Sequence, residues 1–299
     1  MLRRYSVLAA ALVTLVVATP AVAQGKVKVV ATFSILGDLV KNVGGERVEI
    51  ATLVGPNGDA HVYAPSPADA KYVGAAKVVF VNGLGLEGWM TRLVTASGTK
   101  ASTVVATMGI KPRRMEDEHR PGQLVSDPHA WQSIANAKIY VANIRDGLIR
   151  ADPAGKRDYE ANASAYLAKL DTLETEVKEA MAKIPAERRR IITTHDAFGY
   201  FGDAYRMEFI SPEGVSTESE VSAQDVAKII GQIRKQKIPA VFMENISDPR
   251  LMQQIARETG ARIGGTLYSD ALSDEKGPAA SYIDMMRHNV KQLAAALTS

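Results

Sequence analysis

The chain has 299 residues, a length that accommodates two domains of ordinary size. Its composition, 46% hydrophobic and 23% charged, is that of a soluble globular protein. A formal net charge of only +3 argues against nucleic acid as a partner, and the lack of cysteine excludes disulfides, thiolate catalysis and thiolate metal sites.

Residues 1–23 have the pattern of a secretory signal peptide. Arg3 and Arg4 form a basic start, an apolar stretch follows, and residues 21–23 read AVA, a small-x-small cleavage site. The apolar run is short for a membrane span and Pro20 interrupts it, so we expect cleavage. No cysteine follows for lipid attachment, so we predict a soluble, exported protein of the periplasm.

After the signal, β-branched runs alternate with helical patterns. The runs predict strands at 26–33, 48–56, 78–83 and 102–107. The intervening patterns predict helices at 35–45, 66–76 and 85–96. Strands that alternate with helices indicate a parallel sheet covered on both faces.

Two different stretches follow this unit. Residues 111–128 carry many charges without an apolar period, which predicts a surface loop. A helical pattern then runs from beyond Trp131 to Pro153. From Tyr159 to Ile184 apolar residues recur at steps of three and four, which predicts one helix about 39 Å long. Such a helix would lie along both halves of the molecule and hold them at a fixed separation.

A second α/β unit completes the chain. Its predicted strands are 189–195, 206–210, 240–245 and 261–270, and its predicted helices are 221–236, 248–260 and 279–297. We therefore predict an α/β protein with an N-terminal lobe at 24–155, a linking helix at 156–185 and a C-terminal lobe at 186–299.

Four potential metal ligands lie at loops or strand ends, where open α/β sheets bind their ligands. His61 lies in the turn-rich stretch GPNGDAHVYAPSPAD, and His129 lies in SDPHAW. His195 ends IITTH, and Asp270 ends GGTLYSD. Three imidazoles and one carboxylate suit a tetrahedral Zn²⁺, whereas Mg²⁺ and Ca²⁺ prefer oxygen ligands. The set predicts a transition-metal site.

Each of these residues also has a purely structural interpretation. His61 could be a solvated loop histidine, and His129 could cap the following helix. His195 could be a hydrogen-bonded histidine at a strand end, and Asp270 could cap a turn. The two remaining histidines are His119 and His288. We expect both at the surface, with metal capture by the loop at 112–126 as the alternative for His119.

The motifs around these ligands resemble a known family. DAHVYAPSPAD, SDPHAW, TTHDAFGYF, VSTESEVSAQDV, VFMEN and LYSDALS occur in the order and spacing of the cluster A-I (cluster 9) solute-binding proteins, the metal receptors of bacterial zinc and manganese ABC transporters. The resemblance covers essentially the whole mature chain. It implies two α/β lobes joined by one long rigid helix, with a metal buried in the cleft between them. The implied ligands are His61, His129, His195 and Asp270.

The same resemblance bears on the metal and on the partners. Manganese receptors usually carry a carboxylate at the position of His195, so the histidine implies the zinc branch, with a manganese or mixed receptor as the alternative. An added imidazole nitrogen also favours Zn²⁺ over Mn²⁺. The long His- and Asp-rich loop of many zinc receptors is missing here. An ABC permease, its ATPase and a periplasmic metallochaperone are the implied partners of a monomeric receptor.

Two other classes of protein compete with the receptor. A zinc hydrolase needs an open coordination position for water and a nearby base, but the chain contains neither HExxH nor GxSxG. We therefore predict no enzyme, and an adhesin on the same fold stays open. A buried imidazole ligand also needs a partner for its second nitrogen, for which Asp127, Asp196 and Glu218 are candidates. The rigid linking helix predicts release by local loop motion.

Overall fold

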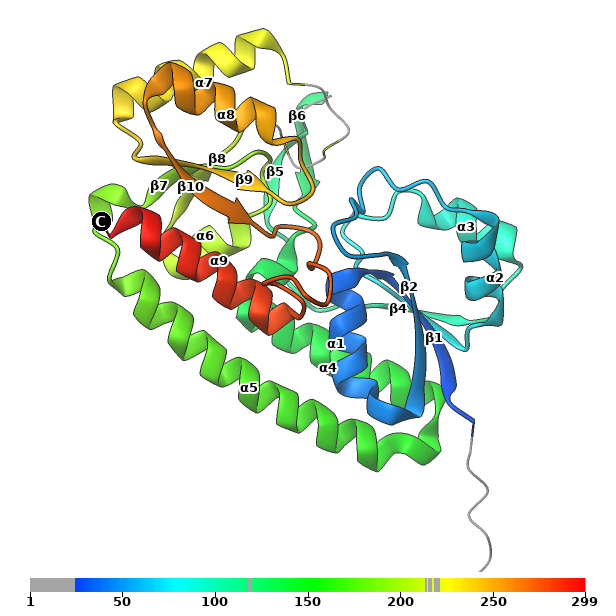
Figure 1. The fold of residues 1–299 in the computed structure, drawn as a ribbon. Coiled ribbons are helices and arrows are strands. Elements are labelled where there is room, and N and C mark those ends of the chain that lie inside the picture. Colours follow the sequence, from blue (N-terminus) through cyan, green and yellow to red (C-terminus); the bar gives the residue numbers. More distant parts are fainter. Residues whose placement is uncertain (1–24, 118–119, 213, 215–216, 218–220, 299) are drawn as a thin grey trace, which may run out of the picture.

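The computed structural model describes residues 25–117, 120–212, 214, 217 and 221–298. The predicted signal peptide lies outside these residues. Two α/β lobes lie side by side above one long helix, which passes beneath both of them (Figure 1). None of the helices in the described part of the chain combines the length and apolar character that crossing a membrane requires.

The first lobe is built on a parallel sheet with the strand order β2-β1-β3-β4. The strands are β1 (Val27–Phe33), β2 (Val48–Val54), β3 (Val78–Val81) and β4 (Ser102–Val105). Helices α1 (Ser34–Gly44), α2 (Pro67–Ala75) and α3 (Met90–Ser97) cover it, with the short turn η1 (Gly45–Arg47) after α1. Ser66 caps α2 through the amide of Asp69, as expected of a serine that precedes a proline.

The stretch predicted as a surface loop contains a β-hairpin. Strands β5 (Arg114–Asp117) and β6 (Arg120–Ser126) pair in antiparallel register, with Met115 opposite Val125. The prediction missed the hairpin because its charges leave no alternation of apolar and polar residues. The hairpin lies beside the second lobe, on the side that faces the first lobe (Figure 1).

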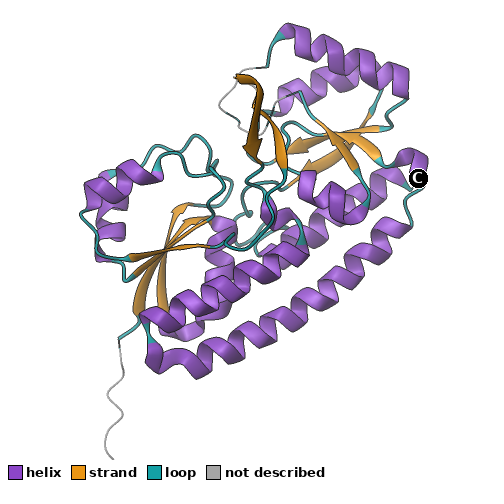
Figure 2. Cartoon of the chain, turned by 180° about the vertical axis from the view of Figure 1, so that it is seen from behind, coloured by secondary structure: helices purple, strands orange, loops and turns teal. Residues whose placement is uncertain are grey.

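Helices connect the two sheets. The turn η2 (Ala130–Gln132) leads into α4 (Ile134–Ala151), and η3 (Pro153–Gly155) leads into α5 (Lys156–Ala182), which has 27 residues. Helix α5 is the predicted linking helix, and Figure 2 shows it extending under both lobes. The division into 24–155, 156–185 and 186–299 stays a prediction.

The second lobe repeats the architecture of the first, with the strand order β10-β9-β7-β8. Its strands are β7 (Arg190–Ile192), β8 (Glu208–Ile210), β9 (Ala240–Glu244) and β10 (Arg262–Leu267), and the turn η4 (Ala186–Arg188) precedes them. Its helices are α6 (Gly199–Tyr205), α7 (Ala223–Gln236), α8 (Pro249–Thr259) and α9 (Tyr282–Leu297). Strands β7 and β10 end three residues before His195 and Asp270, so both candidate ligands lie in loops rather than at strand termini.

One buried apolar cluster spans both lobes. It includes Phe33 of β1, Trp131 of η2, Leu170 of α5 and Leu293 of α9. Helices α1, α4, α5 and α9 therefore share a core, and burial of that core resists separation of the lobes. A smaller cluster packs α7 and α8 onto the second sheet.

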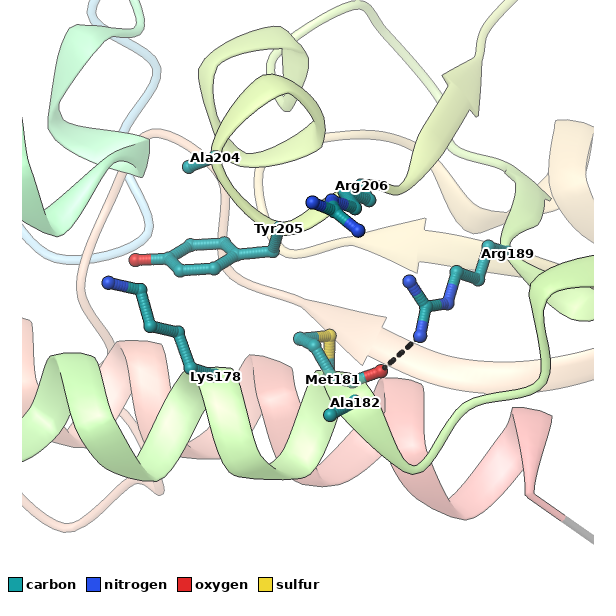
Figure 3. A pocket seen from close by; sticks show the side chains of 7 residues that line it. All are labelled: Lys178, Met181, Ala182, Arg189, Ala204, Tyr205 and Arg206. Carbon is teal, nitrogen blue, oxygen red and sulfur yellow. Dashed lines mark hydrogen bonds between the residues drawn. The ribbon is translucent and has the colours of Figure 1, made fainter.

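The end of α5 is capped by a side chain of the second lobe. Arg189 donates from Nε to the carbonyl of Ile184 at 2.9 Å, and from its guanidinium to the carbonyl of Met181 at 3.1 Å (Figure 3). A cation suits these carbonyls at the negative end of the helix. The neighbouring Lys178 pairs with Glu174 at 2.9 Å. Arg189 therefore fixes the end of α5, whereas Lys178 forms an ion pair within the helix.

Candidate metal centre

The structure brings the four predicted ligands together between the lobes. His61 lies in the loop between β2 and α2, and His129 directly precedes η2. His195 follows β7, and Asp270 follows β10. One ligand-type atom from each residue lies within 4.8 Å of the corresponding atoms of the other three. Two segments from each lobe thus contribute to one cluster.

The spacing of these atoms fits one tetrahedral ion. The Nε2 atoms of His61 and His129 lie 3.2 Å apart. Asp270 Oδ2 lies 3.0 Å from Nε2 of His61, 3.3 Å from Nε2 of His195 and 3.6 Å from Nε2 of His129. Ligand atoms bonded to one tetrahedral ion at about 2.0–2.1 Å lie roughly 3.3 Å from one another. All four measured separations are near this value.

The His61 loop is stiffened by contacts within its own lobe. Trp89 donates from its indole nitrogen to the carbonyl of Ala60 at 2.8 Å. The ring of Tyr63 packs against that of Trp89, with 5.1 Å between centroids. Asp59 accepts the backbone N–H of His61 at 2.8 Å, an Asx turn that sets the direction of the chain at the ligand.

His129 is held by the carboxylate of Asp127. Asp127 Oδ1 lies 2.9 Å from both the backbone nitrogen and Nδ1 of His129, and both residues are completely buried. A ring that donates from Nδ1 leaves the lone pair of Nε2 pointing into the cluster. Asn82 Nδ2 donates to the carbonyl of Pro128 at 2.9 Å and so holds the residue before His129. The Oδ1 of Asn82 in turn accepts a hydrogen bond from the hydroxyl of Tyr140.

His195 is backed by Glu244, at the end of β9. Glu244 Oε2 lies 2.6 Å from Nδ1 of His195, and Oε1 accepts the backbone N–H groups of Thr194 and His195 at 2.8 and 2.9 Å. The sequence interpretation missed Glu244 and proposed Asp127, Asp196 and Glu218. Asp127 is confirmed as a partner of a ligand ring, and Glu218 lies outside the described residues. The signal that could have identified Glu244 is its position at the end of a buried strand.

Asp270 is positioned largely by the first lobe. The carbonyl of Ser269 accepts hydrogen bonds from the indole of Trp131 at 2.9 Å and from the amide of Gln132 at 2.7 Å. Ser34 Oγ accepts the N–H of Leu272 at 2.9 Å. The loop that carries the acidic ligand is therefore tied to the opposite lobe on both sides of Asp270.

The buried charges of the cluster shift one another's pKa values. Burial opposes protonation of His129, but Asp270 and Asp127 outweigh it and raise the pKa of His129 to about 9. Burial likewise opposes protonation of His195, while Glu244 and Asp270 raise its pKa well above the usual range. Burial alone would raise the pKa of Asp270, but His129 and His195 hold it well below the usual range. The carboxylates thus attract positive charge to the centre of the cluster.

Burial and unpaired polar atoms also fit a bound cation. Side chains of His129, His195 and Asp270 are 0% exposed, and that of His61 is 5% exposed. His195 Nε2 and Asp270 Oδ1 are buried without a hydrogen-bond partner among the described residues. Unpaired buried donors and acceptors are unfavourable, and coordination of an ion would satisfy them.

Of the two remaining histidines, the structure describes only His288, which does not join the cluster. His119 lies outside the described residues. His288 is half-buried, and its Nε2 lies 3.0 Å from the carbonyl of Thr266, so the prediction of a surface position was only partly right.

Two lobes on a rigid helical base, with ligand-type side chains converging between them, define the class of metal-binding receptors for transport. The chain belongs to one family of that class. Residues 29–296 match the ZnuA family, described as zinc-uptake complex component A, periplasmic. Members of this family are substrate-binding receptors of ABC transporters rather than enzymes.

Named relatives of the chain bind different metals. It is 36% identical over 269 residues to the iron-binding protein YfeA of Yersinia pestis, covering 90% of this chain and 86% of that protein. It is also 36% identical over 272 residues to the manganese-binding lipoprotein MntA of Halalkalibacterium halodurans, covering 91% and 88%. Membership in the family therefore indicates a metal-binding protein, but the relatives differ in their metal and do not identify the one bound here.

Solved structures agree on the fold. The periplasmic zinc-binding protein TroA of Treponema pallidum superposes with a TM-score of 0.85 at 32% identity, covering 92% of this chain and 100% of that one. A mutant manganese-bound periplasmic metal-binding protein of Candidatus Liberibacter asiaticus has a TM-score of 0.83 at 32% identity, covering 91% and 99%. The prediction of two parallel-sheet α/β lobes with a long connecting helix is confirmed.

Proposed function

We propose that the chain is a periplasmic receptor that binds one Zn²⁺ through His61, His129, His195 and Asp270 and delivers it to an ABC permease for uptake. The single observation that carries this proposal is the convergence of four ligand-type atoms within 4.8 Å of one another in a buried cluster. A closed four-ligand site holds its ion tightly and leaves no position for a reactive water. Such a site suits capture and delivery.

The donor set supports zinc. Three imidazole nitrogens and one carboxylate oxygen favour Zn²⁺ over Mn²⁺, which prefers oxygen ligands. Asp127 and Glu244 make the rings of His129 and His195 better donors and orient them toward the ion. Together with Asp270, these carboxylates place three negative charges around a divalent ion.

Manganese is the second candidate. Several relatives are named as manganese-binding proteins. Asp270 Oδ1 has no hydrogen-bond partner among the described residues, so the carboxylate can offer its second oxygen as a fifth donor. A fifth donor with oxygen chemistry would suit Mn²⁺ better than a strictly tetrahedral site does.

Competition titration against chelators of known affinity tests the choice of metal. We expect one ion per chain and a dissociation constant for Zn²⁺ at least on the order of a hundredfold below that for Mn²⁺. Replacement of His195 by Asp should narrow this gap. Affinities within tenfold of each other in the unmodified protein would favour the manganese receptor, and no bound ion at all would reject both.

Delivery requires partners beyond this chain. Relatives are named as substrate-binding components of ABC transporters, which work with a permease and an ATPase. Within this proposal the receptor acts as a soluble monomer of the periplasm after cleavage of residues 1–23, and a periplasmic metallochaperone is a further candidate partner. Loading from a chaperone would bring the loop at 112–126, with His119, into the capture step.

A further inference from the structure

His61 differs from the other two histidines in how it is held. His129 and His195 have carboxylates at their outer ring nitrogens. Among the described residues, no side chain is bonded to the outer ring nitrogen of His61, and only this ligand reaches solvent. Ala60 anchors the His61 loop in the shared core, but the loop residues on either side of it, 55–59 and 61–68, are half-buried or exposed. The ion therefore has its easiest exit on the side of His61.

Asn57, four residues before His61, ties this loop to the opposite lobe. Its backbone N–H donates to the carbonyl of Leu272 at 2.9 Å. Its Oδ1 accepts from Asn245 Nδ2 at 3.2 Å, and its own Nδ2 donates to Asp274 at 3.4 Å. The backbone of Asn57 is left-handed, with φ at 54°, a conformation that asparagine tolerates better than most residues. One residue thus makes three bonds across the interlobe gap.

The partners of Asn57 adjoin the groups that build the metal centre. Asn245 directly follows Glu244, which backs His195. Leu272 and Asp274 follow Asp270 in the loop that carries the acidic ligand. Opening of the His61 loop must therefore break contacts with the loop that carries Asp270 and with the end of β9, whose Glu244 backs His195.

Asp59 adds a second tether. One of its oxygens accepts the N–H of His61, and the other accepts the hydroxyl of Thr217 at 2.5 Å. The loop is thus held to the second lobe by hydrogen bonds at its edge, whereas apolar packing holds the lobes to each other. Hydrogen bonds at a solvent-exposed edge each contribute little and exchange readily with water.

We propose that Asn57 is a positioning residue that latches the His61 loop onto the second lobe and thereby sets the rate at which the bound ion leaves. This inference rests on the proposed function as a metal receptor. Because the shared core keeps the lobes together, the ion is released when the loop, rather than a whole lobe, moves away.

The variant Asn57→Gly tests the latch. Glycine adopts the left-handed backbone without strain and keeps the N–H that donates to Leu272, so only the side-chain bonds to Asn245 and Asp274 are lost. Stopped-flow transfer of Zn²⁺ from the loaded protein to excess EDTA should be about tenfold faster. The rate of Zn²⁺ association and the visible spectrum of the Co²⁺-loaded protein should stay as in the unmodified protein.

Lys237→Gly is the matched control. Lys237 is exposed, lies at the end of α7 and also has a left-handed backbone, with φ at 52°, so it reports the effect of a new glycine alone. Its zinc release should be unchanged. Combining Asn57→Gly with Asn245→Ala should accelerate release by less than the product of the two single effects, because they remove one shared bond.

Several results would overturn the latch. These are release from Asn57→Gly at the unmodified rate, equal acceleration by Lys237→Gly, or full multiplication of the two single effects. A changed Co²⁺ spectrum in Asn57→Gly would also overturn it, because Asn57 would then shape the ligand set rather than time its opening. Failure of the unmodified protein to bind one zinc would instead reject the proposed function, so the two failures are distinguishable.

Discussion

The two sides of the candidate metal centre are built differently. On the inner side, which we call the floor, His129 and His195 are completely buried, and each has a carboxylate at its outer ring nitrogen. On the outer side, which we call the rim, His61 lies on a turn-rich loop whose bonds to the second lobe are hydrogen bonds near the surface. Buried carboxylates hold the two floor residues in place, whereas hydrogen bonds near the surface hold the rim loop to the second lobe.

This difference separates two requirements of a transport receptor. A pre-arranged, dry floor favours tight and selective binding, because little reorganisation is needed when the ion arrives. A rim held by few bonds permits exchange, since local opening of a loop requires far less free energy than separation of two packed lobes. The comparison predicts that changes to the floor alter affinity most and changes to the rim alter rates most.

Removal of one ligand from each side gives the largest expected effects. Binding free energies of about 10–16 kcal/mol for a zinc site, shared by four ligands, correspond to roughly 3 kcal/mol or more for each ligand. His129→Ala should therefore weaken zinc binding several hundredfold, since it also leaves Asp127 and Asp270 buried without their partner. His61→Ala should weaken it less, because water can reach the vacated position. A larger loss of zinc affinity in His61→Ala than in His129→Ala, measured by competition titration, would contradict the comparison.

Replacement of a carboxylate behind the floor should have the next largest effect. Glu244→Gln keeps an acceptor for the backbone N–H groups of Thr194 and His195 but removes the charge beside the ring of His195. Partners of this kind typically contribute about 10- to 100-fold to metal affinity. Glu208→Gln, at a half-exposed carboxylate of the same lobe, is the control and should bind zinc normally. If Glu244→Gln and Glu208→Gln bind zinc with equal affinity, the carboxylate of Glu244 does not support the ligand His195.

The pH dependence of binding should follow from proton competition. In the metal-free protein, burial opposes protonation of His129, but Asp270 and Asp127 raise its pKa to about 9, so this imidazole is protonated at neutral pH. Binding must then release protons, and affinity should fall as the pH decreases below about 9, by about tenfold per pH unit for each proton released. Zinc titrations in weak buffer would detect the released protons, and a constant affinity between pH 8 and 6 would contradict this prediction.

The smallest effect is expected from an anchor of the rim within its own lobe. Trp89→Phe keeps the apolar ring but loses the bond from the indole to the carbonyl of Ala60. One such bond contributes about 1 kcal/mol, so zinc release should become a few times faster with little change in the selectivity between metals. Tyr72→Phe, at an exposed residue of α2, is the control. Slower release from Trp89→Phe would mean that the anchor strains the loop instead of holding it.

The sequence patterns predicted most of the fold, but they predicted few of the contacts that support the candidate ligands. Alternating strands and helices indicated both sheets, and the spacing of apolar residues indicated α5. The hairpin of β5 and β6 was missed because its charges obscure any period. The position of Glu244 at the end of a buried strand could have marked it as a candidate, but that position does not show which ligand its carboxylate will face.

By itself, the sequence determined which side chains are available and at which loops they emerge. Residue type and the rule that parallel strands present ligands at their carboxyl ends made His61, His195 and Asp270 candidates, and His129 was a candidate from its loop. The family resemblance implied all four as one set. Only the tertiary structure decided which groups hold those ligands. The bond between Asn57 and Asn245 joins residues 188 positions apart, and that between Glu244 and the amide of His195 joins residues 49 apart. Local propensity and periodicity act over a few residues. The contact of Glu244 exists only once β7 and β9 have joined one sheet, and that of Asn57 only once the two lobes have packed together.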